Sequence, residues 1–486
     1  MKSAVLYLYS MHDIQRTNGM LRQVLSVALS LGSVAIVALP AVTYEVGPGK
    51  TLARLHDVPW ETLQPGDTVL IQWRPEPYRE RILICTRGTA TAPVTIRGIP
   101  GPEGQLPVID GRDAWSPPGP SAWDNGRSVV QIGNANYEPG TLPSYIILEN
   151  LDIRSGRPPY TYITADGSKR IYRKNAAAVY VERGENLIIR HCEIHDSGNG
   201  LMIGSSDRSV SAKVLVEANY IYGNGIEGSL YEHNSYTAAR GITFQYNRYG
   251  PLRAGARGNN LKDRSTSLVI RYNWIEGGNR ELDIVDAEDS IQLRQDPNYR
   301  TSFVYGNVLI EREGDGNPQM VHYGGDSTHI DWYRKGTLYF YNNTLISLRT
   351  DRTVLFRLST NEERCEAHNN IFYTVGSGRT LALLQSDGIL TLGRNWLKKG
   401  WVMSPEPLRG QVLRQASLIE GETPGLVEGG PLMFHLAPTS PCIGRAGKLP
   451  KSVIAVSQEY IIHQSGQSRK SKKVRDLGAF EFRPQS

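Results

Sequence analysis

The chain has 486 residues and a formal net charge of +6, a positive charge too small to indicate a nucleic-acid partner. Its four cysteines lack the short spacings of a zinc site or a disulfide framework. A chain of this length ordinarily suggests about two to four domains, but a repeat protein lengthens around a single core and needs no second one.

Residues 1–41 are predicted to be a secretory signal that lies outside the folded domain. Arg22 precedes an apolar run from Val24 to Leu39, and the run ends in the sequence LPA, a small-residue end typical of a cleavage site. Met20 is an alternative start of the protein. The run is short for a membrane span, although an uncleaved anchor stays open as an alternative. We therefore expect a bacterial protein that is secreted, periplasmic or attached to the cell surface.

Six short segments between Leu187 and Leu345 repeat one pattern, an apolar stretch that ends at a small or polar residue and resumes with an apolar pair. The segments are rich in β-branched residues, lack the helical period, and recur every 26 to 35 residues. A unit of this size cannot bury its apolar face alone, so the units are expected to stack as a parallel β-solenoid. The turn residues form one expected column: Cys192, Asn219, Asn247, Asn273, Asn307 and Asn342.

Side-chain amides in such a column can hydrogen-bond along the stack, and the pattern resembles the right-handed parallel β-helix proteins of the pectate-lyase-like superfamily. The resemblance extends from Tyr44 to about Phe482, and the chain is similar to bacterial exported polysaccharide lyases. It implies an all-β fold, a right-handed single-stranded parallel β-helix (solenoid) over residues 42–486. It also implies a short N-terminal helical cap at about Thr51 to Leu63.

Three stretches are expected to stand out from the regular coils. Insertions are predicted near residues 154–175, which are basic and rich in tyrosine, and near residues 311–335, between two repeats. Long insertions on solenoids tend to wall the binding face. The basic stretch 464–475 is expected to be a disordered loop.

Candidate catalytic residues are most concentrated around the sequence RGNNLKDRS. Counting back eleven residues from Asn247 and from Asn273 reaches Tyr236 and Lys262, so a constant register places these two residues one above the other. Side chains alternate along a strand, and matching the next apolar pair places Asp283 beside Lys262. An outward column of three residues is therefore predicted. Its expected neighbours are Asn234, Arg264 and Glu281.

Such a column suits β-elimination on a uronic-acid chain, which needs a base and a positive charge that neutralises the substrate carboxylate. The segment RGNNLKDR is similar in kind to the Lys-bearing or Arg-bearing catalytic strands of β-helix lyases. We therefore expect Lys262 to be the base, with a pKa lowered by Arg257 and Arg264. His233 or Tyr236 is expected to protonate the leaving oxygen.

Further residues are expected to bind substrate or a cation. The substrate-binding set is Asn234, Asn260, Asp283, His322, Tyr323 and Trp332. A Ca²⁺ ion, the only cofactor expected, would take oxygen ligands from Asp283, Asp286 and Glu288. The alternative for Lys262 and Arg264 is a solvated face of ordinary ion pairs, and the alternative for the carboxylates is an acidic loop that balances nearby arginines.

The sequence thus predicts an exported lyase of an acidic polysaccharide, a monomer with no membrane span after signal removal and no nucleic-acid partner. Two other classes stay open because the fold hosts many activities. One is a different carbohydrate enzyme, either a glycoside hydrolase with paired carboxylates such as Asp283 and Asp286 or a uronate epimerase. The other is a non-catalytic glycan-binding surface protein.

Overall fold

A computed structural model describes residues 40–116, 125–134, 142–470 and 474–484. The chain divides into residues 1–40 and residues 41–486, and the second of these units contains the repeats. The expected secretory signal lies outside the described residues, apart from its last two positions. Within the described ranges, no helix is long and apolar enough to cross a membrane.

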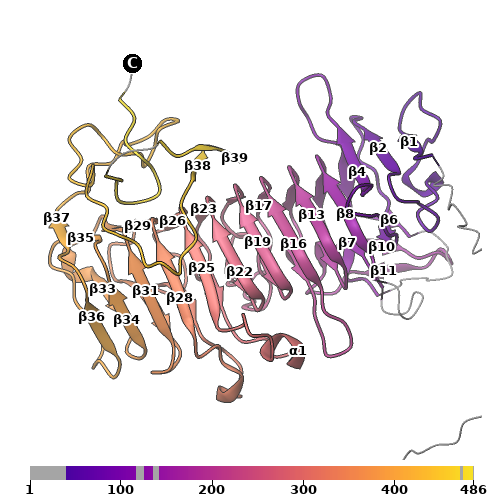
Figure 1. Ribbon diagram of the computed structural model, residues 1–486. Helices are drawn as coiled ribbons and strands as arrows, with labels where there is room; N and C mark the ends of the chain where they lie inside the picture. Colours follow the sequence, from indigo (N-terminus) through magenta and orange to yellow (C-terminus); the bar gives the residue numbers. More distant parts are fainter. Residues whose placement is uncertain (1–39, 117–124, 135–141, 471–473, 485–486) are drawn as a thin grey trace, which may run out of the picture. The chain divides into compact units, whose positions relative to one another are not determined.

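Parallel strands dominate the second unit, and successive coils add one strand to each of three sheets (Figure 1). The first sheet has 13 strands: β1 (Thr43–Val46), β2 (Thr68–Gln72), β4 (Val94–Ile99), β8 (Ser144–Glu149), β13 (Glu185–Arg190), β16 (Ala212–Glu217), β19 (Arg240–Gln245), β22 (Thr266–Arg271), β25 (Thr301–Tyr305), β28 (Thr337–Tyr341), β31 (Arg364–His368), β34 (Ile389–Leu392) and β36 (Gln411–Arg414).

The second and third sheets complete each coil. The second has 10 strands: β3 (Ile82–Ile84), β7 (Ser128–Ile132), β12 (Ala177–Val181), β15 (Asn199–Ile203), β18 (Ser235–Thr237), β21 (Leu261–Asp263), β24 (Leu282–Ile284), β27 (Gln319–Tyr323), β30 (Thr353–Leu358) and β33 (Leu381–Leu384). The third has 11 strands: β5 (Val108–Asp110), β9 (Asp152–Arg154), β14 (Glu193–His195), β17 (Tyr220–Tyr222), β20 (Arg248–Tyr249), β23 (Trp274–Glu276), β26 (Val308–Glu311), β29 (Thr344–Ser347), β32 (Ile371–Thr374), β35 (Trp396–Lys398) and β37 (Ile419–Gly421). The fold is the right-handed parallel β-helix that the repeat and the resemblance predict.

Few other elements occur among the described residues. A small sheet joins β6 (Ala114–Trp115), β10 (Thr161–Ile163) and β11 (Lys169–Ile171), and an antiparallel pair joins β38 (Gln458–Ile461) and β39 (Ser465–Ser468). The helical elements are short: η1 (Leu55–Asp57), α1 (Ile291–Arg294), η2 (Ile330–Trp332) and η3 (Gly378–Thr380).

Alternating side chains of each strand fill the interior of the coils. In the first sheet, Leu187, Val214, Ile242 and Leu268 are register partners on four successive strands, and each is at most 3% exposed. Burial of one such side chain contributes roughly 1.5–3 kcal/mol. A column of this kind therefore stabilises the stack and fixes its register, because a shift by one residue would turn the whole column outward.

An asparagine ladder runs along the turn after the first sheet, as the repeat predicts. The backbone N–H and the side-chain amide of Asn247 both donate to Asn273 Oδ1, at 2.9 Å and 3.0 Å, and the same pair of bonds joins Asn273 to Asn307. The next member is Asn343, and the expected Asn342 is wrong by one residue. From His191 to Asn369, the residue before the ladder position takes a left-handed backbone, and Asn342, with φ of 52°, fills that place.

The N-terminal end of the core is closed where the cap is expected, but by little helix. Within residues 51–63 only η1 is helical, and Leu55, Val58, Trp60 and Leu63 are buried under the first coil. Val58 precedes a proline and is extended, which ends the helical turn. Apolar side chains of a mainly irregular segment therefore cover the end of the core, where a helix was expected.

The three stretches expected to stand out contain regular structure. The hairpin of β10 and β11 lies within residues 154–175, and β27 of the second sheet lies within residues 311–335. β39 begins the basic stretch 464–475, and Arg469 is buried against Glu481 at 2.7 Å. Residues 471–473 of that stretch lie outside the described ranges.

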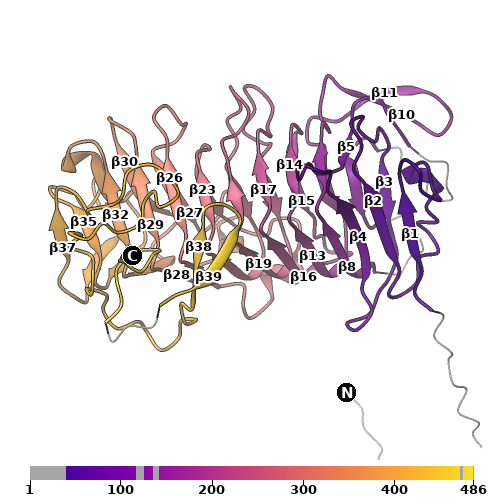
Figure 2. The ribbon, with the colours of Figure 1, turned by 90° about the horizontal axis from the view of Figure 1, so that it is seen from above.

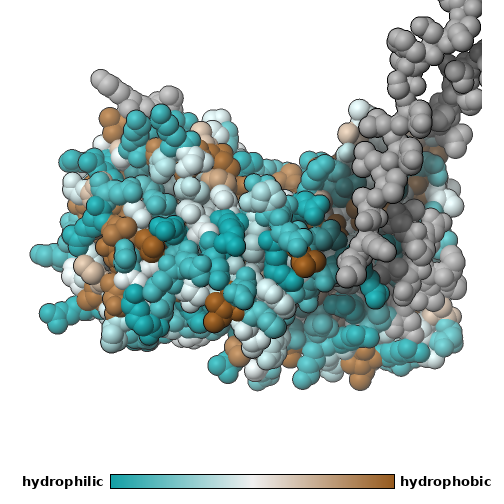
Figure 3. All heavy atoms as spheres, turned by 60° about the horizontal axis from the view of Figure 1, so that its bottom comes forward, coloured by the Kyte–Doolittle hydropathy of each residue, from teal (hydrophilic) through white to brown (hydrophobic). Residues whose placement is uncertain are grey.

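The C-terminal segment lies along the outside of the coils (Figures 1 and 2). Tyr460 of β38 stacks on Trp274 of β23 with ring centroids 6.4 Å apart, and the Ser457 N–H donates to Tyr272 Oη at 3.1 Å. On the face drawn in Figure 3, the described residues are mainly hydrophilic and the apolar ones form small separate groups. The described part of that face therefore presents no broad apolar surface.

Candidate active site

Five outward side chains of the second sheet form one column. The register pairs Tyr236 with Lys262, Lys262 with Asp283, Asp283 with His322, and His322 with Arg357. The predicted stacking of the first three residues is confirmed. Each strand contributes one residue because β18, β21, β24, β27 and β30 are consecutive strands whose outward positions coincide.

A cleft of about 650 Å³ opens beside this column. Four cations and three carboxylates line it: Lys262, Arg264, Arg280, Arg357, Asp283, Glu288 and Asp326. The remaining lining residues are polar, aromatic or apolar: Asn175, Asn199, Met202, Leu230, Tyr231, His233, Tyr236, Asn259, Asn279, Asn317, His322, Gly325 and Tyr333. The cleft therefore combines charged groups on its floor with aromatic rings, a composition suited to a sugar chain that carries charge.

Lys262 is buried on the floor of the cleft between two carboxylates. Its Nζ donates to Asp283 Oδ2 at 2.9 Å and also to Asp326 Oδ2. Burial disfavours the ammonium, but the charges of Asp283 and Asp326 outweigh that cost and raise the pKa of Lys262 above its usual value. The expected lowering of this pKa is therefore wrong. Asp326 follows β27, in a different coil, so the local sequence around Lys262 does not reveal it.

Arg264 joins the column to the acidic residues of the cleft. Its Nε donates to Tyr236 Oη at 2.9 Å, and its Nη2 lies 3.1 Å from Asp326 Oδ1 and 3.3 Å from Glu288 Oε2. Because Tyr236 Oη accepts this bond, its own hydroxyl proton can point into the cleft. Arg264 therefore both neutralises carboxylates and orients the phenol.

His233 is buried beside Tyr236 and stays neutral. Its Nδ1 accepts the backbone N–H of Asn259 at 2.9 Å, so the ring proton resides on Nε2. The ring meets Tyr236 edge-on, with centroids 5.4 Å apart. Burial and the nearby charge of Lys262 lower the pKa of His233 to about 3. His233 can donate a hydrogen bond at neutral pH, but it does not carry a charge there.

Asp283 links Lys262 to the buried imidazole of His322. Asp283 Oδ1 lies 2.7 Å from His322 Nδ1, and Asp283 Oδ2 accepts from the Asn259 side chain at 2.7 Å. Burial raises the pKa of Asp283, but Lys262 and the hydrogen bond from His322 outweigh it and hold that pKa well below its usual value. Asp283 is thus a buried, ionised carboxylate that contacts three hydrogen-bonding partners.

The three expected calcium ligands do not fit a Ca²⁺ ion. Asp286 Oδ1 accepts the Asp326 N–H at 2.8 Å, and Glu288 pairs with Arg264. Calcium takes six to eight oxygen ligands that are turned toward one point. Here Asp283, Asp286 Oδ1 and Glu288 are turned toward cations or protein donors. One oxygen of the set, Asp286 Oδ2, lacks a hydrogen-bond partner among the described residues, and one oxygen is too few for Ca²⁺, so we derive no step through a metal.

Several expected site residues lie away from the cleft. Asn234 and Asn260 are fully buried in a second amide ladder, where Asn234 Nδ2 donates to Asn260 Oδ1 at 2.8 Å. Tyr323 is buried in the core. Trp332 belongs to η2 and stacks on His329, and Arg257 is exposed outside the lining.

Two charged residues of the cleft, Arg280 and Arg357, were not predicted from the sequence, and Asp326 was expected only as part of the stretch 311–335 that walls the binding face. Arg280 precedes β24, and its Nη1 lies 3.7 Å from Asp283 Oδ1. Asp326 lies in the turn after β27. Arg357 is exposed and makes no ion pair within 4.0 Å in the described part of the chain. A signal for Arg357 exists in the sequence, because it is the one polar residue in the stretch VLFRL and alternation turns it outward.

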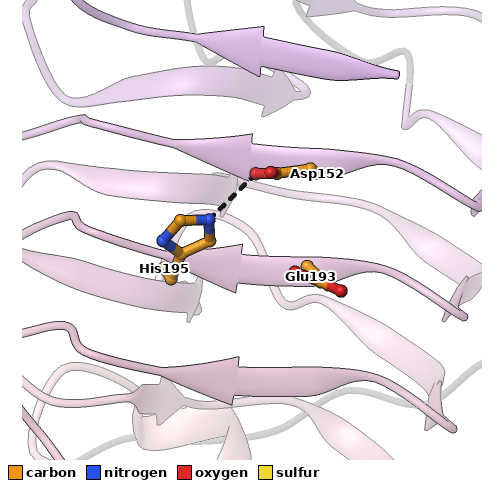
Figure 4. Close-up of side chains that lie close together, drawn as sticks. All are labelled: Asp152, Glu193 and His195. Carbon is orange, nitrogen blue, oxygen red and sulfur yellow. Dashed lines mark hydrogen bonds and ion pairs between the residues drawn. The ribbon is translucent and has the colours of Figure 1, made fainter. Parts of the chain in front are cut away.

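A separate group of potential metal ligands lies on the third sheet. Asp152 of β9 and Glu193 and His195 of β14 offer ligand atoms within 4.8 Å of one another. Figure 4 shows them on two adjacent strands, with His195 Nε2 bonded to Asp152 Oδ1 at 3.0 Å. Arg154 also pairs with Asp152 at 3.2 Å. These pairings occupy Asp152, and the group lies outside the cleft.

Comparison with known proteins supports the fold. Residues 163–345 match the family model of the right-handed β-helix region, and no curated protein matches the chain. Similar solved structures include pectate lyase Pel9A, at 11% identity over 91% of this chain and 97% of that chain, with a TM-score of 0.46. The alginate lyase of Paenibacillus sp. str. FPU-7 is 12% identical over 68% of this chain and 92% of that chain, with a TM-score of 0.39. The GH136 lacto-N-biosidase of Eubacterium ramulus is 13% identical over 78% of this chain and 68% of that chain, with a TM-score of 0.43. The activity must therefore be argued from the site.

Proposed function

We propose that the protein is an exported lyase that cleaves a uronic-acid polysaccharide by β-elimination in the cleft of the second sheet. One observation carries this proposal: Lys262, Arg264, Arg280 and Arg357 line a single cleft. A uronic-acid chain brings a carboxylate to each residue, and elimination requires that carboxylate to be neutralised. Arg357 is exposed and makes no ion pair within 4.0 Å among the described residues, so its guanidinium is available to the substrate.

The protonation states of Asp283 and Asp326 favour elimination over hydrolysis. A glycoside hydrolase needs a carboxylic acid whose pKa is raised enough to keep its proton. Asp283 and Asp326 both have pKa values below the usual range, because Lys262 outweighs the effect of burial at each. The buried acids with raised pKa values, Glu281 and Glu311, do not line the cleft.

In the proposed reaction, Tyr236 acts first as the base and then as the acid, and Lys262 supplies a positive charge. The reaction starts from the Tyr236 phenolate, which the Arg264 guanidinium stabilises and which takes the proton from the carbon beside the substrate carboxylate. The electron pair forms the new double bond, the bond from the next carbon to the glycosidic oxygen breaks, and that oxygen receives a proton from Tyr236. Protonated Lys262 stabilises the enolate-like intermediate. This role replaces the base expected from the sequence.

The test is a panel of acidic polysaccharides, including polygalacturonate, alginate and chondroitin, followed by ultraviolet absorbance of the new double bond. The proposal expects absorbance to rise with at least one member, in the presence or absence of a chelator. New reducing ends without that absorbance would identify a hydrolase. Binding with neither product would identify a non-catalytic glycan-binding protein.

A further inference from the structure

A serine, a histidine and an aspartate from three successive coils are hydrogen-bonded in series. Ser359, directly after β30, has its Oγ 2.9 Å from His322 Nε2 on β27. His322 Nδ1 lies 2.7 Å from Asp283 Oδ1 on β24. The same relation of hydroxyl, imidazole and carboxylate activates the nucleophile of serine hydrolases on unrelated folds. The proposed lyase chemistry uses neither Ser359 nor His322.

The charge states of the series are those that activation requires. Burial lowers the pKa of His322, so its imidazole is neutral and can accept a proton. Asp283 is ionised and therefore accepts the proton on Nδ1, which leaves the Nε2 lone pair toward Ser359. The carboxylate also stabilises the imidazolium that forms when the hydroxyl proton is transferred.

Ser359 is partly buried and lines a second cleft of about 340 Å³. Arg357 lines both clefts, so the two are neighbours along the sheet. Other lining groups of the second cleft are Gln319, Gln385, Ser386, Asp387 and Arg409. A polar cleft with a cation and an accessible hydroxyl suits a sugar residue that carries both a carboxylate and an ester.

Gly325 also contacts the hydroxyl. Its N–H donates to Ser359 Oγ at 2.9 Å, and its carbonyl accepts from the same hydroxyl at 3.0 Å, so the hydroxyl proton can turn to this carbonyl or to His322 Nε2. A Ser359 that merely ties this turn in place would explain those two contacts. A purely structural role of Ser359 would not require a neutral His322 imidazole whose second nitrogen is held by the buried Asp283 carboxylate. The presence of His322 and Asp283 therefore indicates a chemical role for the Ser359 hydroxyl.

We propose that Ser359, His322 and Asp283 form a second catalytic site, which hydrolyses acyl esters on the hydroxyl groups of an acidic polysaccharide. Ser359 Oγ bonds to the acyl carbon while its proton passes to His322 Nε2. The bond between the acyl carbon and the sugar oxygen breaks, and His322 returns the proton to that oxygen. Water, deprotonated by His322, then releases the acid and restores Ser359. Arg357, which lines the same cleft, supplies positive charge for the developing oxyanion.

The test combines covalent labelling with acetate release. Full-length protein is treated with a fluorophosphonate probe, and the labelled peptide is located by mass spectrometry. In parallel, acetate release from acetylated polygalacturonate is measured for the parent, Ser359→Ala and Ser404→Ala. Ser404 is a matched control, because its Oγ donates to the Gln385 carbonyl and has no histidine partner among the described residues.

The proposal expects the label on Ser359 and a fall in acetate release of about 10³- to 10⁴-fold in Ser359→Ala, with Ser404→Ala like the parent. A parent that is neither labelled nor active on the ester, or a Ser359→Ala variant as active as the parent, would overturn it. Acetate release needs no chain cleavage. An esterase without double-bond formation would thus refute the lyase alone, and the reverse result would refute the esterase alone.

Discussion

Lys262 Nζ lies 2.9 Å from Asp283 Oδ2, across two adjacent strands of the second sheet, and both side chains are buried. Removal of one member of a buried pair leaves an uncompensated charge, which typically costs about 3–5 kcal/mol. The pair therefore keeps the ammonium protonated and fixed in place. Because Lys262 stays protonated, its substitution should affect activity through the loss of a positive charge rather than the loss of a base.

Lys262→Ala should lower the turnover of a substrate that the parent cleaves by about 10²- to 10³-fold, because a preorganised charge at the intermediate is lost. Lys262→Arg should retain measurably more activity, since it keeps the charge. Rates are compared after circular dichroism confirms that each variant is folded. The control is Lys213→Ala, an exposed lysine of β16. If Lys262→Arg were as inactive as Lys262→Ala, Lys262 would be a base after all.

Arg357→Ala should raise KM by roughly tenfold, equivalent to about 1.4 kcal/mol, with little change in kcat. The reason is that Arg357 binds substrate carboxylates and lies at the edge of the catalytic column. The rise should shrink at high salt, where charge attraction is screened. Arg352→Ala, an exposed arginine before β30, is the matched control. An unchanged KM would remove Arg357 from the binding site.

The sequence predicts which residues of the site stack on adjacent strands, but it does not predict all the charged residues that surround Lys262. The constant spacing before the ladder residues predicts that Tyr236 stacks on Lys262, because strands in a solenoid repeat their register. Asp326 and Arg280 enter from turns whose paths depend on packing between coils. Burial lowers the pKa of Lys262, and Asp283 and then Asp326 outweigh it, so the direction of the shift depends in part on a residue that only the structure places beside Lys262.

The contribution of Glu281 to stability should fall as pH rises above the usual pKa of its carboxyl group. Burial, and then the charges of Glu311 and Asp315, raise the pKa of Glu281 well above its usual value of 4.5. The folded protein therefore binds more protons than the unfolded chain above that pH, and stability present at low pH is lost as pH increases. Glu281→Gln should flatten this dependence and raise the midpoint of thermal unfolding at pH about 8 relative to the parent. Parallel melting curves at acidic and alkaline pH check this. An equal pH dependence in both proteins would contradict it.

Asn343→Ala should lower the free energy of unfolding by roughly 1–3 kcal/mol, because its buried ladder partners lose hydrogen bonds. Asn342→Gly should cost less, since glycine accepts the left-handed backbone at that position and only one long hydrogen bond, from the Asn342 side chain to the Gly478 carbonyl at 3.4 Å, is lost. Denaturant unfolding of the two variants measures the difference. The reverse order would contradict the ladder register. This pair also explains the sequence error, because adjacent asparagines satisfy the same pattern and only the backbone conformation distinguishes them.

The fate of solvent oxygen tests the central claim most directly. The protein is incubated with its acidic polysaccharide in water that carries a heavy oxygen isotope, and the masses of the products are measured by mass spectrometry. β-Elimination predicts unsaturated products that lack one water relative to hydrolysis products and carry no label at the cleavage point, and Tyr236→Phe should form them about 10²- to 10⁴-fold more slowly. Saturated products that carry the label would contradict the account.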